Sequence, residues 1–244
     1  MLKLYYDLHI HSCLSPCGND DMLPSNIVGM AALKGLDVIA LTDHNSCKNC
    51  QAVMELAKEY GITAIAGMEL TTSEEVHVVC LFPSLEKAMA FDSFIHKKLP
   101  QIKNDEKIFG KQQICDKDDT ITGTEEFLLI NATEINFDEV FDVVSEFGGI
   151  MIPAHIDKSA NSLISNLGFI PPDSRFACAE VKHTGFLDKL TKQHGYLKNC
   201  KIISDSDAHY IENINEPVHY IYSETKEIPD ILNALKQKSD SDEF

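Results

Sequence analysis

Two histidines placed two residues apart are the first residues in this chain that could do chemistry. His9 and His11 follow an apolar, β-prone run that begins at Tyr5. In a β-strand, residues two apart point to the same side, so both imidazoles would project into one space. Neutral imidazoles held side by side are typical ligands of a divalent transition metal. One such pair is a weak signal, because surface strands also carry histidines by chance.

Further histidines and carboxylates stand beside the strand-like runs that follow. Each of them alone has an ordinary explanation, such as a capped turn, a satisfied core histidine or a solvated carboxylate. Their shared position argues against chance, which would also scatter such residues over helices and loops. Their number exceeds what one ion can use, so the sequence predicts two or three ions of zinc, manganese or iron. The candidate ligands are His9, His11, His44, Glu69, His77, His155, Asp207 and His209.

The segments that must position these ligands alternate between strand-like and helix-like patterns. Apolar runs such as residues 37–42 and 62–68 are typical of buried parallel strands, and helical patterns such as residues 50–60 lie between them. Such alternation predicts right-handed βαβ units and a parallel sheet. Ligands at the C-terminal ends of the strands favour a (βα) barrel. An open doubly wound sheet would use the same strand ends, but no Gly-rich phosphate loop supports it.

Residues 1–238 are predicted to form a single domain. Residues 100–126 are polar and interrupt the alternation, which predicts a hairpin-like insertion or lid. Residues 239–244 are expected to be a frayed acidic tail.

Composition restricts the partners and the compartment. The 244 residues carry a net charge of −17, and such a surface predicts no duplex nucleic acid partner. Apolar runs are too short to cross a membrane and the N-terminus has no basic signal region, so we expect a cytoplasmic protein without a membrane partner. The eight cysteines are interpreted as reduced thiols rather than a disulfide framework. The sequence indicates no oligomeric state.

Five short motifs, taken in order along residues 1–215, resemble those of the PHP (polymerase and histidinol phosphatase) family. The resemblance implies a distorted (βα)7 TIM-like barrel with a trinuclear metal centre at the C-terminal face of the strands. It also implies three ligand groups: His9, His11, Glu69 and Asp207 for one ion, His77, His155 and a bridging Glu69 for a second, and His44 with His209 for a third. The motifs are Asp7-Leu8-His9-Ile10-His11-Ser12, Leu41-Thr42-Asp43-His44-Asn45, Gly67-Met68-Glu69, Pro153-Ala154-His155 and Ser206-Asp207-Ala208-His209.

The loop after His11 departs from the family pattern, in which an Asp or His completes the third site. Cys17 lies nearest the expected position, and Asp20 is the alternative with a harder oxygen ligand. We favour Asp20, because hydrolytic sites more often use carboxylates. Two cysteine pairs, Cys13 with Cys17 and Cys47 with Cys50, are expected on the same face, either as a functional thiol pair or as ordinary free thiols.

These residues predict a metal-dependent phosphoesterase in which a metal-bridging hydroxide attacks a small phosphorylated metabolite or nucleotide. Asp43 would support the ligands, and Asp205 would either orient water or accept a hydrogen bond at a strand end. Arg175, the only arginine, and Lys182 are the candidate contacts for the substrate phosphate. One alternative is an exonuclease or phosphodiesterase that trims short oligonucleotide ends. Another is a catalytically idle metal-binding accessory module.

Overall fold

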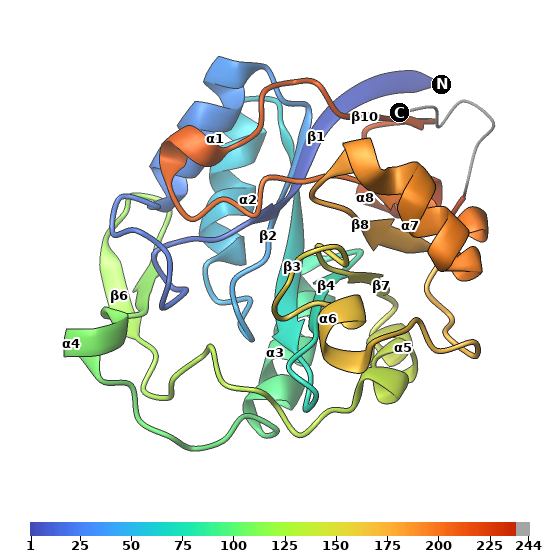
Figure 1. Cartoon of the computed structure of the whole chain (residues 1–244). Helices are drawn as coiled ribbons and strands as arrows, with labels where there is room; N and C mark the ends of the chain where they lie inside the picture. The colour runs from blue at the N-terminus through green and yellow to red at the C-terminus, as the bar shows by residue number, and fades with distance from the viewer. Residues whose placement is uncertain (238–244) are drawn as a thin grey trace.

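A computed structural model describes residues 1–237 of the chain. Its central layer is a sheet of six strands, and a separate pair of strands stands beside it. The sheet curls, and helices cover its outer side (Figure 1). The strands of the sheet are β1 (Leu2–Ile10), β2 (Val38–Leu41), β3 (Thr63–Thr71), β4 (His77–Leu81), β7 (Ile150–Pro153) and β10 (Tyr220–Ser223), and the pair is β8 (Cys178–Glu180) and β9 (Lys201–Ile203).

The helices bury one apolar side each against this layer. In α2, for example, Ala52, Val53 and Leu56 are buried, which is the spacing of one helical face. Among residues 1–237, no helix is both long and apolar enough to span a membrane. The α-helices are α1 (Pro24–Lys34), α2 (Cys50–Glu59), α3 (Leu85–His96), α4 (Glu106–Phe109), α5 (Phe137–Glu146), α6 (Leu163–Leu167), α7 (Leu187–Gln193) and α8 (Ile228–Lys236), and the 3-10 turns are η1 (Thr184–Phe186), η2 (Gly195–Asn199) and η3 (Ile211–Asn213).

The strands run in the order β10-β1-β2-β3-β4-β7, and they are only partly parallel. Strands β1, β2 and β3 pair in parallel, whereas β4 pairs antiparallel with both β3 and β7. The cause is the tight turn of residues 72–76, in which Thr72 N donates to Val76 O over 2.9 Å and reverses the chain without a helix. The fold is therefore α/β with a curled half-barrel sheet, and it does not keep a strict (βα) alternation.

The reversal of β4 decides where His77 lies. A strand that runs against its neighbours begins at the edge where they end. His77 is the first residue of β4 and pairs with Thr71, the last residue of β3. A histidine at the start of a strand thus reaches the same edge as ligands at the ends of other strands.

The β8–β9 pair meets the sheet at this same edge. Ile156 N, just after β7, donates to Glu180 O over 2.9 Å, and His11 N donates to Ala208 O over 3.0 Å. These bonds bring the segments after β7, β8, β9 and β1 around one centre, although they are far apart in the sequence.

A bulge in β1 turns its two histidines inward. Asp7 pairs with Ile39 and Ile10 pairs with Leu41, so β1 contains one residue more than β2 across the same interval. Such an extra residue changes the side to which the following side chains point. The imidazoles of His9 and His11 consequently contact the same carboxylate, that of Glu69 on β3, which confirms that they share a face.

The predicted insertion contains the antiparallel hairpin β5 (Gln113–Cys115) and β6 (Ile121–Thr124). The hairpin is fastened to the loops near the strand ends. The Asn49 side chain donates to Gln113 O over 3.1 Å and accepts from Cys115 N over 2.9 Å. Phe127 and Ile114 pack against a buried cluster that includes Leu14. These contacts are those of a packed part of the domain rather than of a free lid. The predicted tail, residues 239–244, lies outside the described residues.

The space around Gly67 shows how closely β3 and β4 approach beneath the site. A Cβ added there would lie 2.9 Å from Cys80 O and 2.8 Å from a Leu81 methyl carbon. We expect Gly67→Ala to lower the free energy of unfolding by about 1–3 kcal/mol, because the strands must separate. Gly29→Ala is the control, since a Cβ at Gly29, inside α1, meets nothing within 4 Å. Chemical denaturation of both variants measures the effect, and equal stabilities would contradict this reading of Gly67.

Candidate metal centre

Glu69 lies at the centre of the predicted ligands. Its carboxylate is 1% exposed and is surrounded by histidines from four other segments of the chain. Its two oxygens face different groups of imidazoles. Oε1 lies 2.8 Å from His77 Nδ1, 3.3 Å from His9 Nε2 and 3.3 Å from His155 Nε2, while Oε2 lies 3.0 Å from His44 Nδ1 and 3.3 Å from His11 Nε2.

Asp207 and His209 complete the set. Asp207 Oδ1 lies 3.4 Å from His11 Nε2 and 3.6 Å from His9 Nε2. The ring of His209 stacks on that of His11 with centroids 4.2 Å apart. The structure therefore brings all eight predicted histidine and carboxylate ligands to one place.

The arrangement fits divalent metal better than it fits hydrogen bonding. His9 Nε2 and His11 Nε2 face each other at 3.2 Å. His44 Nδ1 and Glu69 Oε2 are 3.0 Å apart, yet their geometry is not that of a hydrogen bond, and neither atom has a hydrogen-bond partner within residues 1–237. Buried polar atoms without partners are costly unless a cation satisfies them. Three groups have ligand atoms within 4.8 Å of one another: His11, His44 and His209; His9, His11 and Glu69; and His44, Glu69 and His77.

Electrostatics keeps the carboxylates of the cluster ionised. Burial alone would raise the pKa of Glu69, but the charges of His77, His9 and His44 outweigh it and hold that pKa well below its usual value. Burial lowers the pKa of His11, but its contacts with Asp207 and Glu69 raise it to about 9. Without metal, protons on His9, His11 and His44, whose pKa values are raised, balance the carboxylates. Divalent ions can replace those protons, so metal binding releases protons.

A second layer of residues orients the ligands. Glu180 Oε2 lies 2.7 Å from His9 Nδ1, which leaves the other ring nitrogen directed at Glu69. The Ser15 hydroxyl lies 2.9 Å from His11 Nδ1 and donates to Asp43 Oδ1 over 2.7 Å. Such partners fix the tautomer and the ring orientation of metal-binding histidines. Sequence analysis gave Glu180 no role, although its place at the end of a buried strand was a usable signal.

Asp43 and Asp205 lie beneath the cluster rather than within it. Asp43 accepts hydrogen bonds from Ser12 N and Ser12 Oγ, both over 2.7 Å, and so holds the loop after His11. Asp205 Oδ1 accepts from Leu8 N over 2.6 Å. Burial, followed by the charges of Glu180 and Asp7, raises the pKa of Asp205 well above its usual value. Asp205 is thus placed as a strand-end acceptor and not where it could orient water in the pocket.

Backbone conformations that side chains rarely adopt occur at the ligands themselves. His155 has φ 30°, Asp207 has φ 54°, and Asn45, next to His44, has φ 47°. Strained residues of this kind cluster at functional sites, where the surrounding structure holds them in place.

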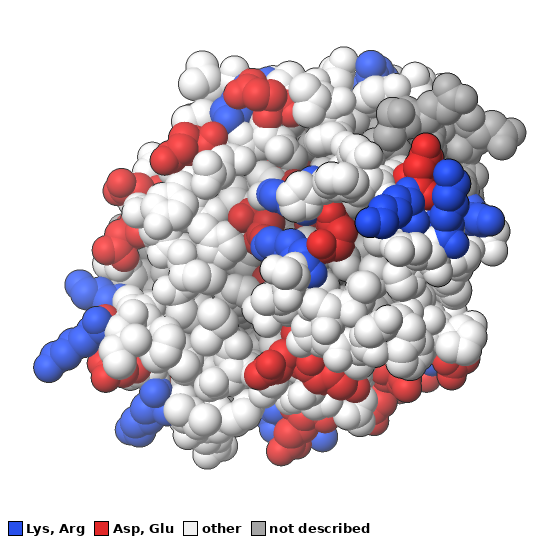
Figure 2. All heavy atoms as spheres, in the orientation of Figure 1, with Lys and Arg blue, Asp and Glu red and all other residues white. Residues whose placement is uncertain are grey.

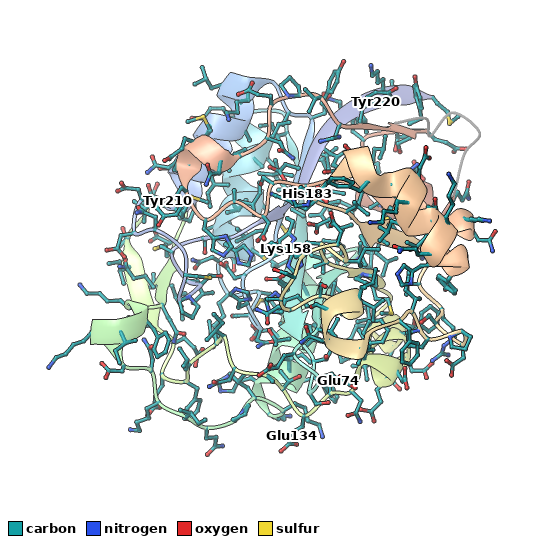
Figure 3. All side chains as sticks on the ribbon, viewed as in Figure 1. Glu74, Glu134, Lys158, His183, Tyr210 and Tyr220 are labelled. Atoms are coloured by element: carbon teal, nitrogen blue, oxygen red, sulfur yellow. The ribbon has the colours of Figure 1, made fainter. Side chains whose placement is uncertain are left out.

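The cluster forms the floor of an open pocket of about 300 Å³. Lys158 stands at the wall, with its Nζ 2.6 Å from Asp207 Oδ2, near the centre of the face shown in Figure 3. Burial lowers the pKa of Lys158, but the charge of Asp207 raises it above the ordinary value, so the ammonium stays protonated. The sequence did not reveal Lys158, because it lies in a loop without periodicity.

The structure does not bring Arg175 to this pocket. Its guanidinium forms a bidentate pair with Asp142, with distances of 2.7 and 2.6 Å, and lines a different hollow beside Phe176. The prediction that Arg175 contacts the substrate phosphate is therefore not supported. Lys182 lies closer, since its Nζ donates to Ser206 O over 2.5 Å, but it does not line the pocket either.

Cys17 and Asp20, the two candidate ligands in the loop after His11, lie in different places. Cys17 lines the pocket with His44 and His209, whereas Asp20 does not and has only a 3.5 Å contact from the Gln113 amide. Burial lowers the pKa of His44, but Glu69 and a hydrogen bond with Cys17 raise it to about 9. The preference for Asp20 is thus not supported, because Asp20 contacts the hairpin and does not line the pocket with the histidines.

The remaining cysteines do not line the pocket and lie as ordinary buried thiols. Cys47 and Cys50 are buried, and both thiols donate to Gly67 O, over 3.1 and 3.5 Å. Cys13 faces Cys115 of the hairpin, with 3.7 Å between the sulfurs. All eight cysteines are free thiols.

Comparison with known proteins identifies this kind of site. The model of the PHP domain matches residues 7–177, which is more than half of the chain. The chain belongs to the PHP domain family. This family comprises metal-dependent phosphoesterases, in agreement with the histidine and glutamate clusters described above.

Relatives of this PHP domain include proteins that act on nucleic acid. An uncharacterised protein of Methanocaldococcus jannaschii is 33% identical over 100 residues, which cover 37% of this chain and 58% of that protein. A 5'-3' exoribonuclease of Haemophilus influenzae is 39% identical over 80 residues, 31% of this chain and 28% of the enzyme. The chain thus spans only part of the length of these relatives.

Solved structures share the fold at low sequence identity. Endonuclease Q from Pyrococcus furiosus, a lesion-specific enzyme, has a TM-score of 0.67 and 17% identity, with 96% of this chain and 56% of that chain covered. A putative metal-dependent phosphoesterase of Bifidobacterium adolescentis has a TM-score of 0.59 and 18% identity, with 94% and 96% covered.

One of these structures corrects the prediction about duplex nucleic acid. An endonuclease Q complex, with a TM-score of 0.65, 17% identity and 96% of this chain covered, contains a 27-mer duplex with an abasic lesion at the active site. A protein that shares this fold is thus seen with duplex DNA at its active site, and the expectation that a duplex is excluded was wrong. The expectation failed because net charge is a property of the whole surface, whereas a nucleic acid responds to charges near the site.

The position of Cys17 leads to a test of the third ligand group. We expect Cys17→Ser to lose about one equivalent of bound metal, because a hydroxyl is a weaker ligand than a thiolate for zinc or iron. Asp20→Asn should retain the metal content of the unsubstituted chain. Elemental analysis of both purified variants after dialysis measures the stoichiometry. Loss of an ion in Asp20→Asn alone would restore Asp20 as the ligand.

Proposed function

We propose that this PHP domain hydrolyses phosphodiester bonds in nucleic acid, at a cluster of two or three divalent ions. The observation that carries the proposal is Glu69, whose two oxygens face two groups of histidines at the floor of an open pocket. One carboxylate between two such groups is suited to hold two cations close together.

The ligand geometry suggests how the ions would be divided. Glu69 Oε1, His77 and His155 would hold one ion, and Glu69 with His9, His11 and Asp207 would hold another. The group of His44 and His209, with Cys17 beside it, would take a third. When bound, divalent ions supply a nucleophile at neutral pH and neutralise charge on the phosphate.

The protein's own contribution is binding and orientation. Lys158 places a positive charge in the pocket wall, where it can meet a non-bridging phosphate oxygen. Glu180 and Ser15 hold the His9 and His11 rings in the orientations that the cluster needs. The complete set of histidines and carboxylates near the strand ends argues against a catalytically idle module, since all eight of these candidate ligands lie in the cluster.

The relatives support nucleic acid as the substrate class. The exoribonuclease of Haemophilus influenzae and endonuclease Q both act on phosphodiesters of polynucleotides, as their names state. A small phosphorylated metabolite is the second candidate, and the pocket volume of about 300 Å³ favours it, because such a space holds little more than one nucleotide.

The proposal is tested by hydrolysis of a substrate panel: single-stranded DNA and RNA oligonucleotides, a duplex with an abasic site, and phosphomonoesters. We expect Mn²⁺-dependent cleavage of at least one oligonucleotide. In Glu69→Gln the rate of cleavage should fall by roughly 100-fold or more, and bound metal should be lost as well. Glu134→Gln is the matched control, because Glu134 is exposed and lies at the lower edge of Figure 3, away from the pocket. Release of phosphate from monoesters alone would instead support the metabolite phosphatase.

Lys158 gives a separate prediction. Lys158→Gln should lower kcat/KM for a phosphodiester by about 10- to 100-fold, the effect of losing one charge-assisted hydrogen bond. Metal content should be unchanged, because Lys158 has no free electron pair to ligate with while it is protonated. Lys158→Arg keeps the charge and should restore much of the activity. Equal kcat/KM in Lys158→Gln and in the unsubstituted chain would show that Lys158 does not contact the substrate.

A further inference from the structure

The few basic residues of this acidic chain are unevenly distributed. The chain holds 21 lysines and arginines against 38 aspartates and glutamates. Residues 181–201 reverse this balance, with five lysines and a single acidic residue, Asp188. This segment is therefore locally positive in a protein that is negative elsewhere.

The segment begins at the rim of the metal pocket. The backbone N–H groups of Lys182 and His183 donate to the carboxylate of Asp157, over 2.7 and 2.8 Å. Asp157 is the neighbour of Lys158 in the pocket wall, and His183 lies close to Lys158 in Figure 3. From this rim the chain continues through η1 into α7.

Most of the lysines of this segment face solvent. Lys182, Lys189 and Lys192 are exposed, and within residues 1–237 no carboxylate lies within 4.0 Å of their ammonium groups. Some lysines elsewhere in the chain are paired, as Lys103 is with Glu126 and Lys226 is with Asp37. Figure 2 shows Lys and Arg side chains gathered over α7, on the face at whose centre Figure 3 labels Lys158. Their charge is available to a ligand.

An aromatic side chain lies between the pocket rim and these lysines. Phe186 is 65% exposed, and its ring centroid is 6.5 Å from that of His183. Exposed aromatic rings beside basic residues are the usual means of binding a nucleic acid strand, since the bases stack and the phosphates pair with lysine. A membrane surface is a poorer fit, because α7 has only seven residues and lacks the broad apolar face of a membrane-bound helix.

We propose that residues 182–192 are a docking surface for a polynucleotide strand whose scissile phosphate occupies the metal pocket. This surface is defined by Lys182, His183, Phe186, Lys189 and Lys192. The proposal rests on the proposed function for the position of the scissile bond, and it adds the path that the rest of the strand follows. Lys158 and Lys182 would contact phosphates nearest the pocket, Phe186 would stack on a base, and Lys189 and Lys192 would meet phosphates farther along.

The test is binding of a fluorescein-labelled 12-nucleotide oligothymidylate by anisotropy, in EDTA so that no turnover occurs. The double variant Lys189→Gln/Lys192→Gln should bind about tenfold more weakly at low salt. Its slope of log affinity against log salt should be shallower by about 1.4, from two lost phosphate contacts on a single strand. Phe186→Ala should weaken binding by about fivefold or more, with the salt slope unchanged.

The matched control is Lys87→Gln/Lys107→Gln, which removes the same charge from exposed positions on α3 and α4. Both double variants should hydrolyse bis(p-nitrophenyl) phosphate with Mn²⁺ at the rate of the unsubstituted chain. Equal loss of oligothymidylate binding in the two double variants would overturn the docking surface, since only net charge would matter. So would unchanged oligothymidylate binding with loss of binding to phosphatidylserine vesicles. Failure to hydrolyse any phosphodiester, with the binding differences intact, would instead count against the proposed function.

Discussion

The buried carboxylate of Glu69 is the constraint around which this domain is arranged. An ionised carboxylate that is taken out of water is very unfavourable unless opposite charge and hydrogen-bond donors compensate for it. Here five imidazoles surround it, from β1, β4 and the segments after β2 and β7. His9, His11 and His44, whose pKa values are raised, could not move alone without leaving charge unbalanced. The cluster therefore links the ends of the strands electrostatically, in addition to the hydrogen bonds that link them as a sheet.

The fold places the residues of the cluster in several different ways. Parallel strands deliver ligands at their C-terminal ends, a bulge redirects His9 and His11, and the reversed β4 delivers His77 from its N-terminal end. Left-handed backbone conformations at His155 and Asp207 contribute to the placement of these two residues. The distortions of the sheet thus coincide with the ligands. Strain of this kind costs stability and is retained where it places a functional group.

The sequence indicated which histidines and carboxylates gather in one place, because these residues are tied to strand ends, which apolar runs reveal. It also set residues 100–126 apart, since they lack the periodicity of their surroundings, and the hairpin β5–β6 lies within them. It failed where position depends on loop geometry. Lys158 and Arg175 are both basic residues in loops, yet one enters the pocket and the other pairs with Asp142 on the surface. Likewise, the choice between Cys17 and Asp20 depends on one turn whose direction no pattern encodes. The direction of β4 could not be predicted, because a strand of given composition can pair with its neighbours either in parallel or antiparallel.

The hairpin of residues 113–124 is held at both of its ends. At its base Asn49 bonds to Gln113 and Cys115, and that same Asn49 side chain also donates to Ser12 Oγ, next to the second histidine of the cluster. At its tip the Asp119 carboxylate accepts from Ser25 N over 3.1 Å, at the start of α1, where Leu23 offers no side-chain cap. A carboxylate in this position stabilises the helix dipole. Residues inserted between base and tip would break one of these attachments. The length of this hairpin is consequently fixed by the domain, so that variation in length during evolution is expected in other surface loops and not here.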